Sequence, residues 1–211
     1  MTEPDIATPH PLSQRFRGFY PVVIDIETTG FDCQQHGILE ISAALPSMDE
    51  SGRLIIKDVL DFAIIPHRDA VIDPSSIAFH GIDPADPDRH ARPEADAFCE
   101  MLQAVRLAQK QHDCQRSILV AHNAQFDQGF LRAAIARNQI KRDPFHPFSS
   151  FDTATLAALA CGQTVLAKAC EYAGIDFNNS DAHSAAYDTR RTAELFCWIV
   201  NRWTDLSEGR G

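Results

Sequence analysis

Apolar residues in the first third of the chain are grouped as in β-strands. The run VVIDI, at residues 22–26, belongs to a predicted strand over residues 20–28. Residues 38–48 and 54–65 also have strand composition, and the turn-forming residues 49–52 separate them. We therefore expect these three segments to form a strand meander.

The rest of the chain alternates between helical and strand patterns. Residues 117–121 (SILVA) predict a short buried strand, and residues 149–152 predict the end of another. Apolar residues at helical spacing predict longer helices over residues 93–111, 125–138, 153–160, 165–172 and 184–203. A meander followed by alternating helices and strands favours an α/β fold, in which helices cover the faces of a mixed sheet.

The chain is predicted to form one domain. Its 211 residues, of which 45% are hydrophobic, are enough for one sizeable core, and no internal segment resembles a linker. We expect the domain at residues 16–204, between a flexible segment at residues 1–15 and a flexible tail at residues 205–211. Residues 67–93 predict a long loop rich in Pro and Asp, with short helices near residues 75–79. Loops of such length usually cover or bind a ligand.

Composition and charge limit which cellular compartments and which binding partners are to be expected for the protein. A net charge of −10 disfavours binding of nucleic acid through bulk positive charge, although a local basic patch or a metal site escapes this argument. No apolar run approaches the length of a transmembrane helix, and the N-terminus has no pattern of a secretory signal. The six cysteines show no C-x-x-C spacing, which suits free thiols in a reducing compartment. We therefore expect a cytoplasmic protein with no membrane contact.

Two acids, Asp25 and Glu27, interrupt a strand that should otherwise be buried. Side chains alternate along a strand, so these two point to the same face. Burial of an ionised carboxylate costs several kcal/mol unless a partner compensates, and two such groups repel each other. A hard cation such as Mg²⁺ or Mn²⁺ between the oxygens would remove the conflict. The alternative is a strand end that turns both acids into solvent, and the pair alone does not decide.

Three aspartates and a histidine lie where predicted helices begin. Asp127 and Asp188 fall one turn or less into their helices, and Asp152 stands directly before another. Acids are favoured at helix N-termini, so each could simply be a cap, and His183 before the last helix could be a surface residue. The joint order is more informative: D-x-E in the first strand, H-N-x-x-F-D after a buried strand, and H-x-x-x-x-D near the end.

These motifs resemble a known family. VIDIETTG, HNAQFD and HSAAYD are similar to the three motifs of the DEDD exonuclease superfamily, in the subgroup whose last motif carries a histidine. The resemblance runs from about residue 16 to residue 203. It implies a ribonuclease H-like fold, with a mixed five-stranded sheet flanked by helices, and 3′→5′ exonuclease activity on single-stranded nucleic acid. Segments outside the motifs, such as GIDPADPDR and RDPFHPFSSFDTATLA, resemble an RNA-trimming branch of this superfamily.

The resemblance implies a catalytic role for the acids and the histidine. Two Mg²⁺ ions, for which Mn²⁺ could substitute, would be held by four carboxylates: Asp25, Glu27, Asp127 and Asp188. Asp25 would bridge the ions. Glu27 and Asp188 would bind the ion beside the attacking water, and Asp127 would act mainly on the other ion through water. His183 would be the general base, because imidazole has a pKa near working pH.

The resemblance also implies residues that support the site or bind the substrate. Asp152 would support the site, with a helix cap as the alternative. Four phenylalanines would stack on the terminal bases, with core packing as the alternative for each: Phe31, Phe79, Phe126 and Phe148. The family pattern places a glutamate that contacts the terminal base where this chain has Ser75. The RNA-trimming branch stalls at a 3′-terminal cytosine, so we expect weaker or altered discrimination here.

A basic patch and a homodimer are implied in the same way. The positions that match the patch are Arg15, Arg17, Lys110 and Arg116. In the family this patch lies away from the catalytic centre and serves the active site of the other subunit. Four solvated charges are the alternative. The implied substrates are single-stranded RNA 3′ ends, those of tRNA and rRNA precursors among them, with single-stranded DNA as a further candidate. The implied products are nucleoside 5′-monophosphates.

Other functions fit parts of the sequence. A DNA-proofreading 3′→5′ exonuclease or an oligoribonuclease would need the same carboxylates, but neither explains the matching segments outside the motifs. A catalytically inactive RNA-binding module would be expected to lack at least one ligand, and all four carboxylates and His183 are present. A structural α/β domain with chance motifs would explain only the hydrophobic pattern.

Overall fold

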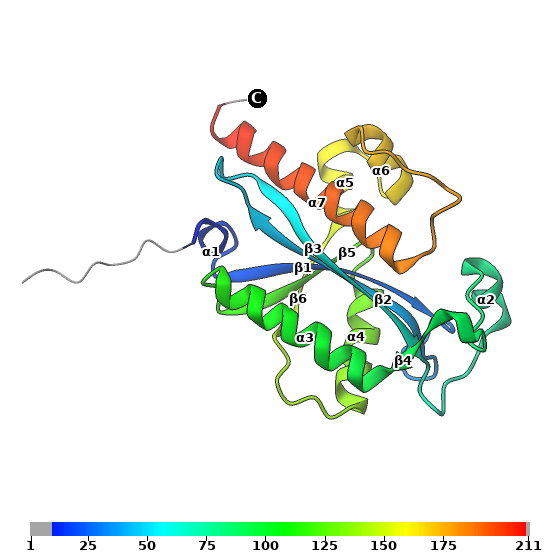
Figure 1. The fold of residues 1–211 in the computed structure, drawn as a ribbon. Coiled ribbons are helices and arrows are strands. Elements are labelled where there is room, and N and C mark those ends of the chain that lie inside the picture. The colour runs from blue at the N-terminus through cyan, green and yellow to red at the C-terminus, as the bar shows by residue number, and fades with distance from the viewer. Residues whose placement is uncertain (1–9, 210–211) are drawn as a thin grey trace, which may run out of the picture.

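A six-stranded sheet forms the centre of the computed structural model, which describes residues 10–209 (Figure 1). The strands are β1 (Phe19–Thr28), β2 (Ile38–Met48), β3 (Leu54–Ile65), β4 (Arg92–Pro93), β5 (Arg116–Ala121) and β6 (Phe145–Asp152). Their order across the sheet is β4-β3-β2-β1-β5-β6. The first three strands form an antiparallel meander, whereas β4, β5 and β6 run parallel to the strands beside which they lie.

Helices cover both faces of the sheet (Figure 1). They are α1 (Pro11–Arg15), α2 (Pro74–His80), α3 (Glu94–Gln111), α4 (Gln125–Arg137), α5 (Thr153–Cys161), α6 (Leu166–Ala173) and α7 (Ala185–Ser207), with a short 3₁₀ helix, η1, at Pro87–Arg89. The long helix α7 crosses β1, β2 and β3 with α5 and α6 beside it, and α3 and α4 lie on the opposite face. No helix within residues 10–209 combines the length and apolar composition needed to cross a membrane.

Burial on both faces explains the continuous apolar run of β1. Val22, Val23 and Ile24 are fully buried although they alternate between the two faces. On the α7 side the helix contributes Phe196, and on the other side α3 contributes Met101, both in the same core cluster. Each such side chain contributes roughly 1.5–3 kcal/mol when it leaves water. The core thus fixes β1, and with it the register of the acids near the end of this strand.

The structure confirms the predicted α/β class and extends the predicted elements in four places. Helix α7 continues to Ser207 and thus into the segment 205–211 that was predicted to be a flexible tail. The sheet has six strands instead of five, because the two-residue β4 adds a short parallel edge beside β3. The predicted strand end at residues 149–152 is the second half of the longer β6. Helix α1 lies inside the segment predicted to be flexible, and its Leu12 is fully buried. Residues 1–9 and 210–211 lie outside the described residues, so that part of the prediction stays a prediction.

The carboxyl end of β1 is tied to the long loop that carries α2 (Figure 1). Asp73, the N-cap of α2, donates its backbone N–H to the Thr29 carbonyl at 2.8 Å. At the other end of α2, the His80 Nε2–H donates to the Thr28 carbonyl at 3.0 Å. Gly30 is required where the chain leaves β1, because a Cβ atom there would overlap the His36 ring. The loop is therefore held against the strand end that bears the acids.

Candidate active site

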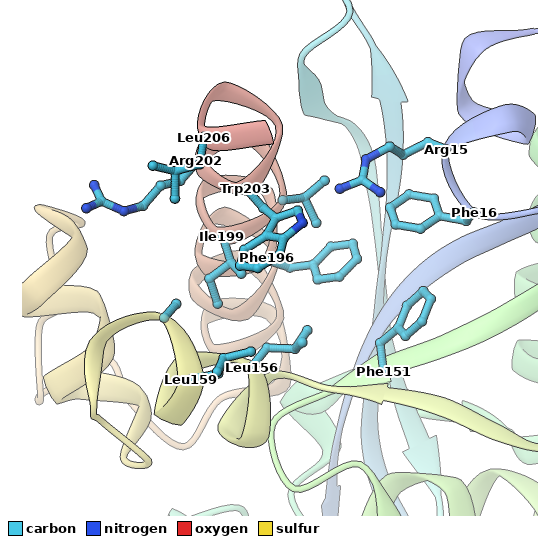
Figure 2. Close-up of a pocket in the computed structure, with 12 residues that line it drawn as sticks. Arg15, Phe16, Phe151, Leu156, Leu159, Phe196, Ile199, Arg202, Trp203 and Leu206 are labelled. Atoms are coloured by element: carbon cyan, nitrogen blue, oxygen red, sulfur yellow. The ribbon is translucent and has the colours of Figure 1, made fainter. Parts of the chain in front are cut away.

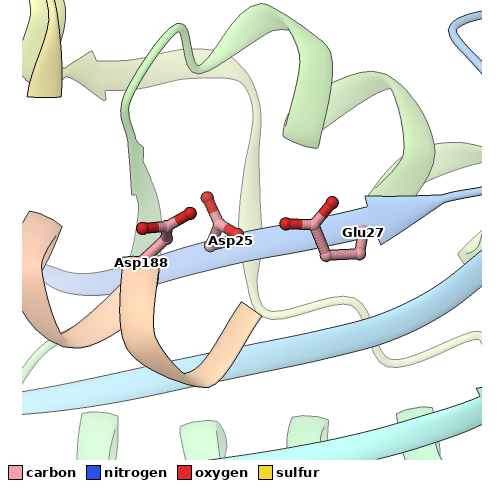
Figure 3. A group of neighbouring side chains, drawn as sticks. All are labelled: Asp25, Glu27 and Asp188. Atoms are coloured by element: carbon pink, nitrogen blue, oxygen red, sulfur yellow. The ribbon is translucent and has the colours of Figure 1, made fainter. Parts of the chain in front are cut away.

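Three carboxylates meet at the carboxyl end of β1 (Figure 3). Asp25 and Glu27 point to the same face of the strand, and Asp188 approaches them from the first turn of α7. One carboxylate oxygen from each of the three lies within 4.8 Å of the others. Strand alternation explains the first pair, and the packing of α7 across β1 and β2 brings in the third.

These acids are costly to ionise in the absence of a cation. Burial, followed by the charges of Asp188 and Glu40, raises the pKa of Glu27 to about 8. Burial also raises the pKa of Asp25 well above its ordinary value, and that of Asp188 rises for the same first reason. The five ion pairs found within residues 10–209 include none of the three acids.

One oxygen of the group has no partner at all among the described residues. Asp188 Oδ1 is buried and makes no hydrogen bond, whereas Oδ2 accepts one from the His183 backbone N–H. Buried polar atoms are nearly always paired, so an orphaned carboxylate oxygen calls for an explanation. Three oxygen ligands with uncompensated charge fit a divalent cation.

Asp127 lies beside this group but is not one of its three members. It falls in the first turn of α4 and is only 3% exposed. After burial, its charge is the largest cause of the raised pKa of Asp25. Burial raises the pKa of Asp127 itself, although its own backbone amide and that of Ile26 oppose the shift. Asp25 therefore interacts with the other two members of the group, Glu27 and Asp188, and also with Asp127.

His183 lies at the surface in the loop before α7 and is held there by two contacts. Its backbone N–H donates to Asp188 Oδ2 at 3.0 Å, and its ring centroid lies 4.2 Å from that of Phe79 on α2. Its φ of 69° is left-handed. A non-glycine residue pays roughly 1–3 kcal/mol for such a conformation, which persists only where the surroundings enforce it.

Asp152 caps a helix and also supports the segment that carries Asp127. Its carboxylate accepts hydrogen bonds from Ala154 N–H and Thr155 N–H at the start of α5. It accepts two more from the backbone of Asn123 and Ala124, at 2.9 and 3.3 Å, just before α4. Partial burial acts to raise the pKa of Asp152, but hydrogen bonds from the Thr155 hydroxyl and from the backbone N–H groups of Ala124, Asn123 and Ala154 together lower it. The cap is thus established, and the same side chain links α5 to the start of α4.

Three of the four predicted stacking phenylalanines are exposed. Phe31, Phe79 and Phe148 are 77%, 66% and 81% exposed. Phe126 is half-buried and contacts Phe31, and both line a cavity of about 410 Å³ in front of α4. Phe148 stands apart on β6, where its ring contacts His146. Core packing, the alternative for each ring, does not account for the three exposed ones.

The four predicted basic residues cluster around the amino end of β1, far from the carboxylates. Arg15 and Arg17 lie over the rings of Phe16 and Phe19. Arg116 begins β5 directly opposite Phe19, and its Nε–H donates to the Phe145 carbonyl. Lys110 is exposed in the last turn of α3.

The sequence patterns did not indicate Glu40 as a site residue. It lies on β2 directly opposite Glu27 in the antiparallel pair. The only signal was a single acid inside the apolar stretch ILEISAAL.

Ser75 lies in the first turn of α2, where its hydroxyl donates to Asp73 Oδ1 at 2.7 Å.

Fold and site together define an exonuclease domain. The family model described as Exonuclease matches residues 22–196. Ribonuclease T from Shewanella oneidensis is 58% identical to the chain over 202 residues, which are 96% of this chain and 91% of the relative. Ribonuclease T from Shewanella denitrificans is 56% identical over 203 residues, or 96% and 90% of the two lengths. The chain belongs to the ribonuclease T family of exonucleases, which confirms the resemblance noted in the sequence.

Solved structures support the fold at lower identity. E. coli exonuclease I in complex with a dT13 oligonucleotide has a TM-score of 0.67 at 19% identity, over 90% of this chain. The match spans only 43% of exonuclease I. A 3′-exonuclease that recognises the histone mRNA stem-loop has a TM-score of 0.65 at 17% identity, over 87% of this chain and 64% of that chain. These matches confirm the ribonuclease H-like fold.

Proposed function

We propose that this 3′→5′ exoribonuclease trims single-stranded 3′ ends of tRNA, rRNA precursors and other stable RNAs in the cytoplasm, releasing nucleoside 5′-monophosphates. The observation that carries the proposal is the group of uncompensated carboxylates next to His183, in a chain 58% identical to a ribonuclease T. Six free cysteines within the described residues are compatible with a reducing compartment. Single-stranded DNA is the second candidate substrate, because exonuclease I binds such oligonucleotides on the same fold.

The carboxylates fit a pair of divalent cations, for which we propose Mg²⁺, with Mn²⁺ as a substitute. Asp25, Glu27 and Asp188 would hold one ion, a role supported by their proximity and by the orphaned oxygen of Asp188. Asp25 and Asp127 would hold the other, Asp127 mainly through water. Bound ions of this kind neutralise the scissile phosphate and lower the pKa of the attacking water.

His183 is the general base in this proposal. It adjoins Asp188, and a neutral imidazole can take a proton from the attacking water near pH 7. Asp188 accepts the His183 backbone N–H and so keeps the loop near the carboxylates. Asp152 acts indirectly, because it fixes the backbone of Asn123 and Ala124 before the helix that carries Asp127.

Exposed aromatic rings would hold the terminal bases. Phe31 and Phe126 offer neighbouring rings beside the start of α4, and Phe79 offers a ring in contact with His183. Stacking on such rings contributes roughly 1–3 kcal/mol per base and tolerates any base. Phe148 would contact a base further along the strand. Ser75 has its hydroxyl bonded to Asp73, so we expect weaker discrimination against a 3′-terminal cytosine.

A homodimer would give the basic residues a role in the reaction. Arg15, Arg17, Lys110 and Arg116 lie at the opposite end of β1 from the acids, so they would serve the site of a second copy. An apolar groove of about 490 Å³ lies between α1, α5 and α7, next to Arg15 (Figure 2). Leu159, Trp203 and Leu206 are 79%, 60% and 56% exposed around it. We propose that a second copy of this chain covers the groove.

The activity is tested with 5′-labelled single-stranded RNA, the wild-type protein and the His183→Ala variant, in Mg²⁺ and in EDTA. The expected result is a ladder that shortens from the 3′ end, disappears in EDTA and nearly disappears in the variant. Matched DNA strands and very short oligomers distinguish this function from a proofreading exonuclease or an oligoribonuclease. Light scattering tests the dimer, and a Trp203→Glu variant should be monomeric. A folded protein that shortens no strand would favour a binding module.

A further inference from the structure

A fourth carboxylate adjoins the group of three. Glu40 on β2 is the direct partner of Glu27 across the β1–β2 pair, as Ser42 is of Asp25. Residues paired in this way face the same side of the sheet, so Glu40 and Glu27 lie next to each other beneath α7. Glu40 is half-buried, but it is not one of the three acids whose oxygens converge. Its role must come from another contact.

That contact is with the first residue of α7. The first N–H groups of a helix have no partner inside the helix and need one from elsewhere. Ser184 occupies the N-cap position, but its side chain makes no capping hydrogen bond. Glu40 Oε2 instead accepts a hydrogen bond from Ala185 N–H at 3.3 Å. The helix dipole also favours an anion at this end. A side chain of β2 therefore serves as the cap of α7.

Glu40 and Asp188 together bracket the residue proposed as the base. Asp188 binds the N–H of His183, and Glu40 binds the N–H of Ala185 two residues later. The left-handed φ of His183 is unfavourable for a histidine, so it depends on contacts of this kind. Asp188 belongs to α7 itself, whereas Glu40 belongs to the sheet. Of these two backbone contacts, only the one from Glu40 links the loop to the strands that carry the other acids.

We propose that Glu40 is a positioning residue for the hydrolysis: it fixes Ala185 against β2 and thereby fixes the His183 imidazole toward the carboxylates. Glu40 binds neither the substrate nor a cation in this account. The inference rests on the proposed function, because it acts through His183 as the base. A displacement of about 1 Å in a catalytic group can lower a rate by roughly 100-fold, so the loss of this anchor should be visible in turnover.

Four variants test the role of Glu40. Glu40→Ala removes the acceptor, Glu40→Gln keeps an acceptor oxygen without the charge, and Glu40→Asp keeps the charge on a side chain too short for Ala185. Asp181→Ala is the matched control. Asp181 lines a pocket of about 560 Å³ together with Glu40 and His183, but within residues 10–209 its side chain bonds only to Asn178 and Ser180. We expect Glu40→Ala and Glu40→Asp to lower kcat about 10- to 100-fold with KM nearly unchanged. Glu40→Gln should regain most of the activity, and the control should match the wild type.

The same substitutions in a His183→Ala background show whether Glu40 acts through the base. If it does, Glu40→Ala should lower the remaining rate by less than about twofold, since the two effects are not additive. An equal loss in both backgrounds would overturn the proposal. So would a Glu40→Gln variant as slow as Glu40→Ala, or a variant whose only change is a higher Mg²⁺ requirement. If Glu40→Ala does not fold, Glu40→Asp replaces it in the comparison of the wild-type and His183→Ala backgrounds.

A readout independent of activity separates this proposal from the proposed function. Backbone hydrogen exchange, followed by NMR, should be faster at Ala185 and its neighbours in Glu40→Ala than in the wild type or in Asp181→Ala. Unchanged exchange would show that Glu40 does not anchor the loop, whatever the activity. If exchange changes as expected but the wild-type protein degrades no RNA, the anchor stands and the proposed reaction fails.

Discussion

The uncompensated acids predict that the protein without metal loses stability as pH rises. Glu27 has a folded-state pKa of about 8 against an ordinary value of 4.5, so the folded protein holds this proton more tightly than the unfolded chain. Stability falls with pH wherever the folded state binds more protons. The loss should begin above about pH 4.5 and be complete once pH passes about 8. Asp25 and Asp188, whose pKa values are also raised, act in the same direction.

The size of this effect follows from linkage. The rise from 4.5 to about 8 for Glu27 corresponds to an upper limit of about 5 kcal/mol, at about 1.4 kcal/mol per tenfold change in proton affinity. Water penetration and relaxation reduce such penalties, so we expect roughly 1–3 kcal/mol in practice. In a chain of this length, each kcal/mol moves the melting temperature by roughly 2–4 °C.

Thermal melts in EDTA between pH 5.5 and pH 8.5 measure the effect directly. Over this range the melting temperature should fall by most of the roughly 2–12 °C that these figures give, and Mg²⁺ at pH 8.5 should recover most of the loss by binding the folded state. Glu27→Gln should make the dependence shallower and weaken the response to Mg²⁺, while Asp25 and Asp188 account for what remains. Glu171→Gln, which alters an exposed ion pair on α6, should leave both unchanged. Equal melting temperatures at both pH values, or the wild-type slope in Glu27→Gln, would refute the reasoning.

Three further substitutions have outcomes that follow from the described contacts. Asp152→Ala should cost roughly 1–2 kcal/mol of stability by removing the α5 cap, seen in urea unfolding, and should lower activity by loosening the start of α4. Gly30→Ala should cost roughly 1–3 kcal/mol, because its Cβ must displace His36, and a melting temperature equal to the wild type would count against that contact. Ser75→Glu should strengthen stalling at a 3′-terminal cytosine, measured on strands that end in one or two cytosines, and unchanged rates would contradict it.

The strands and helices were largely predictable because the spacing of apolar residues shows which side chains of each element are buried. Strands β2 and β3 have the predicted bounds, and α3 and α4 differ from prediction by a single residue at one end. The elements that were missed lack such a pattern. Strand β4 has only two residues and exists because Ile64 and Ile65 pair with it. Helix α1 has five residues, and its one deeply buried apolar side chain is Leu12.

The candidate site was predictable where its residues are close in sequence and otherwise was not. D-x-E in β1 and the two H-containing motifs each carry their pattern locally, so Asp25, Glu27, Asp127 and Asp188 could be proposed together. Glu40 reaches the site only through the register that pairs it with Glu27. A short turn can fix the register of two strands, but β1 and β2 are joined by the long connection at residues 29–37. The apolar groove was not predictable either, because its lining comes from segments that are far apart in the sequence and meet only in the fold.

The separation of acids and basic residues along β1 bears on how substrate is captured. Phe19, beside the basic residues, and Asp25 lie on one strand, and their separation along it is about 20 Å. A net charge of −10 repels RNA at long range, so a basic patch at that distance helps only if a strand can contact both regions. If a second copy covers the groove as proposed, the basic residues of one subunit would serve the acids of the other, and capture and hydrolysis would belong to different subunits of one dimer.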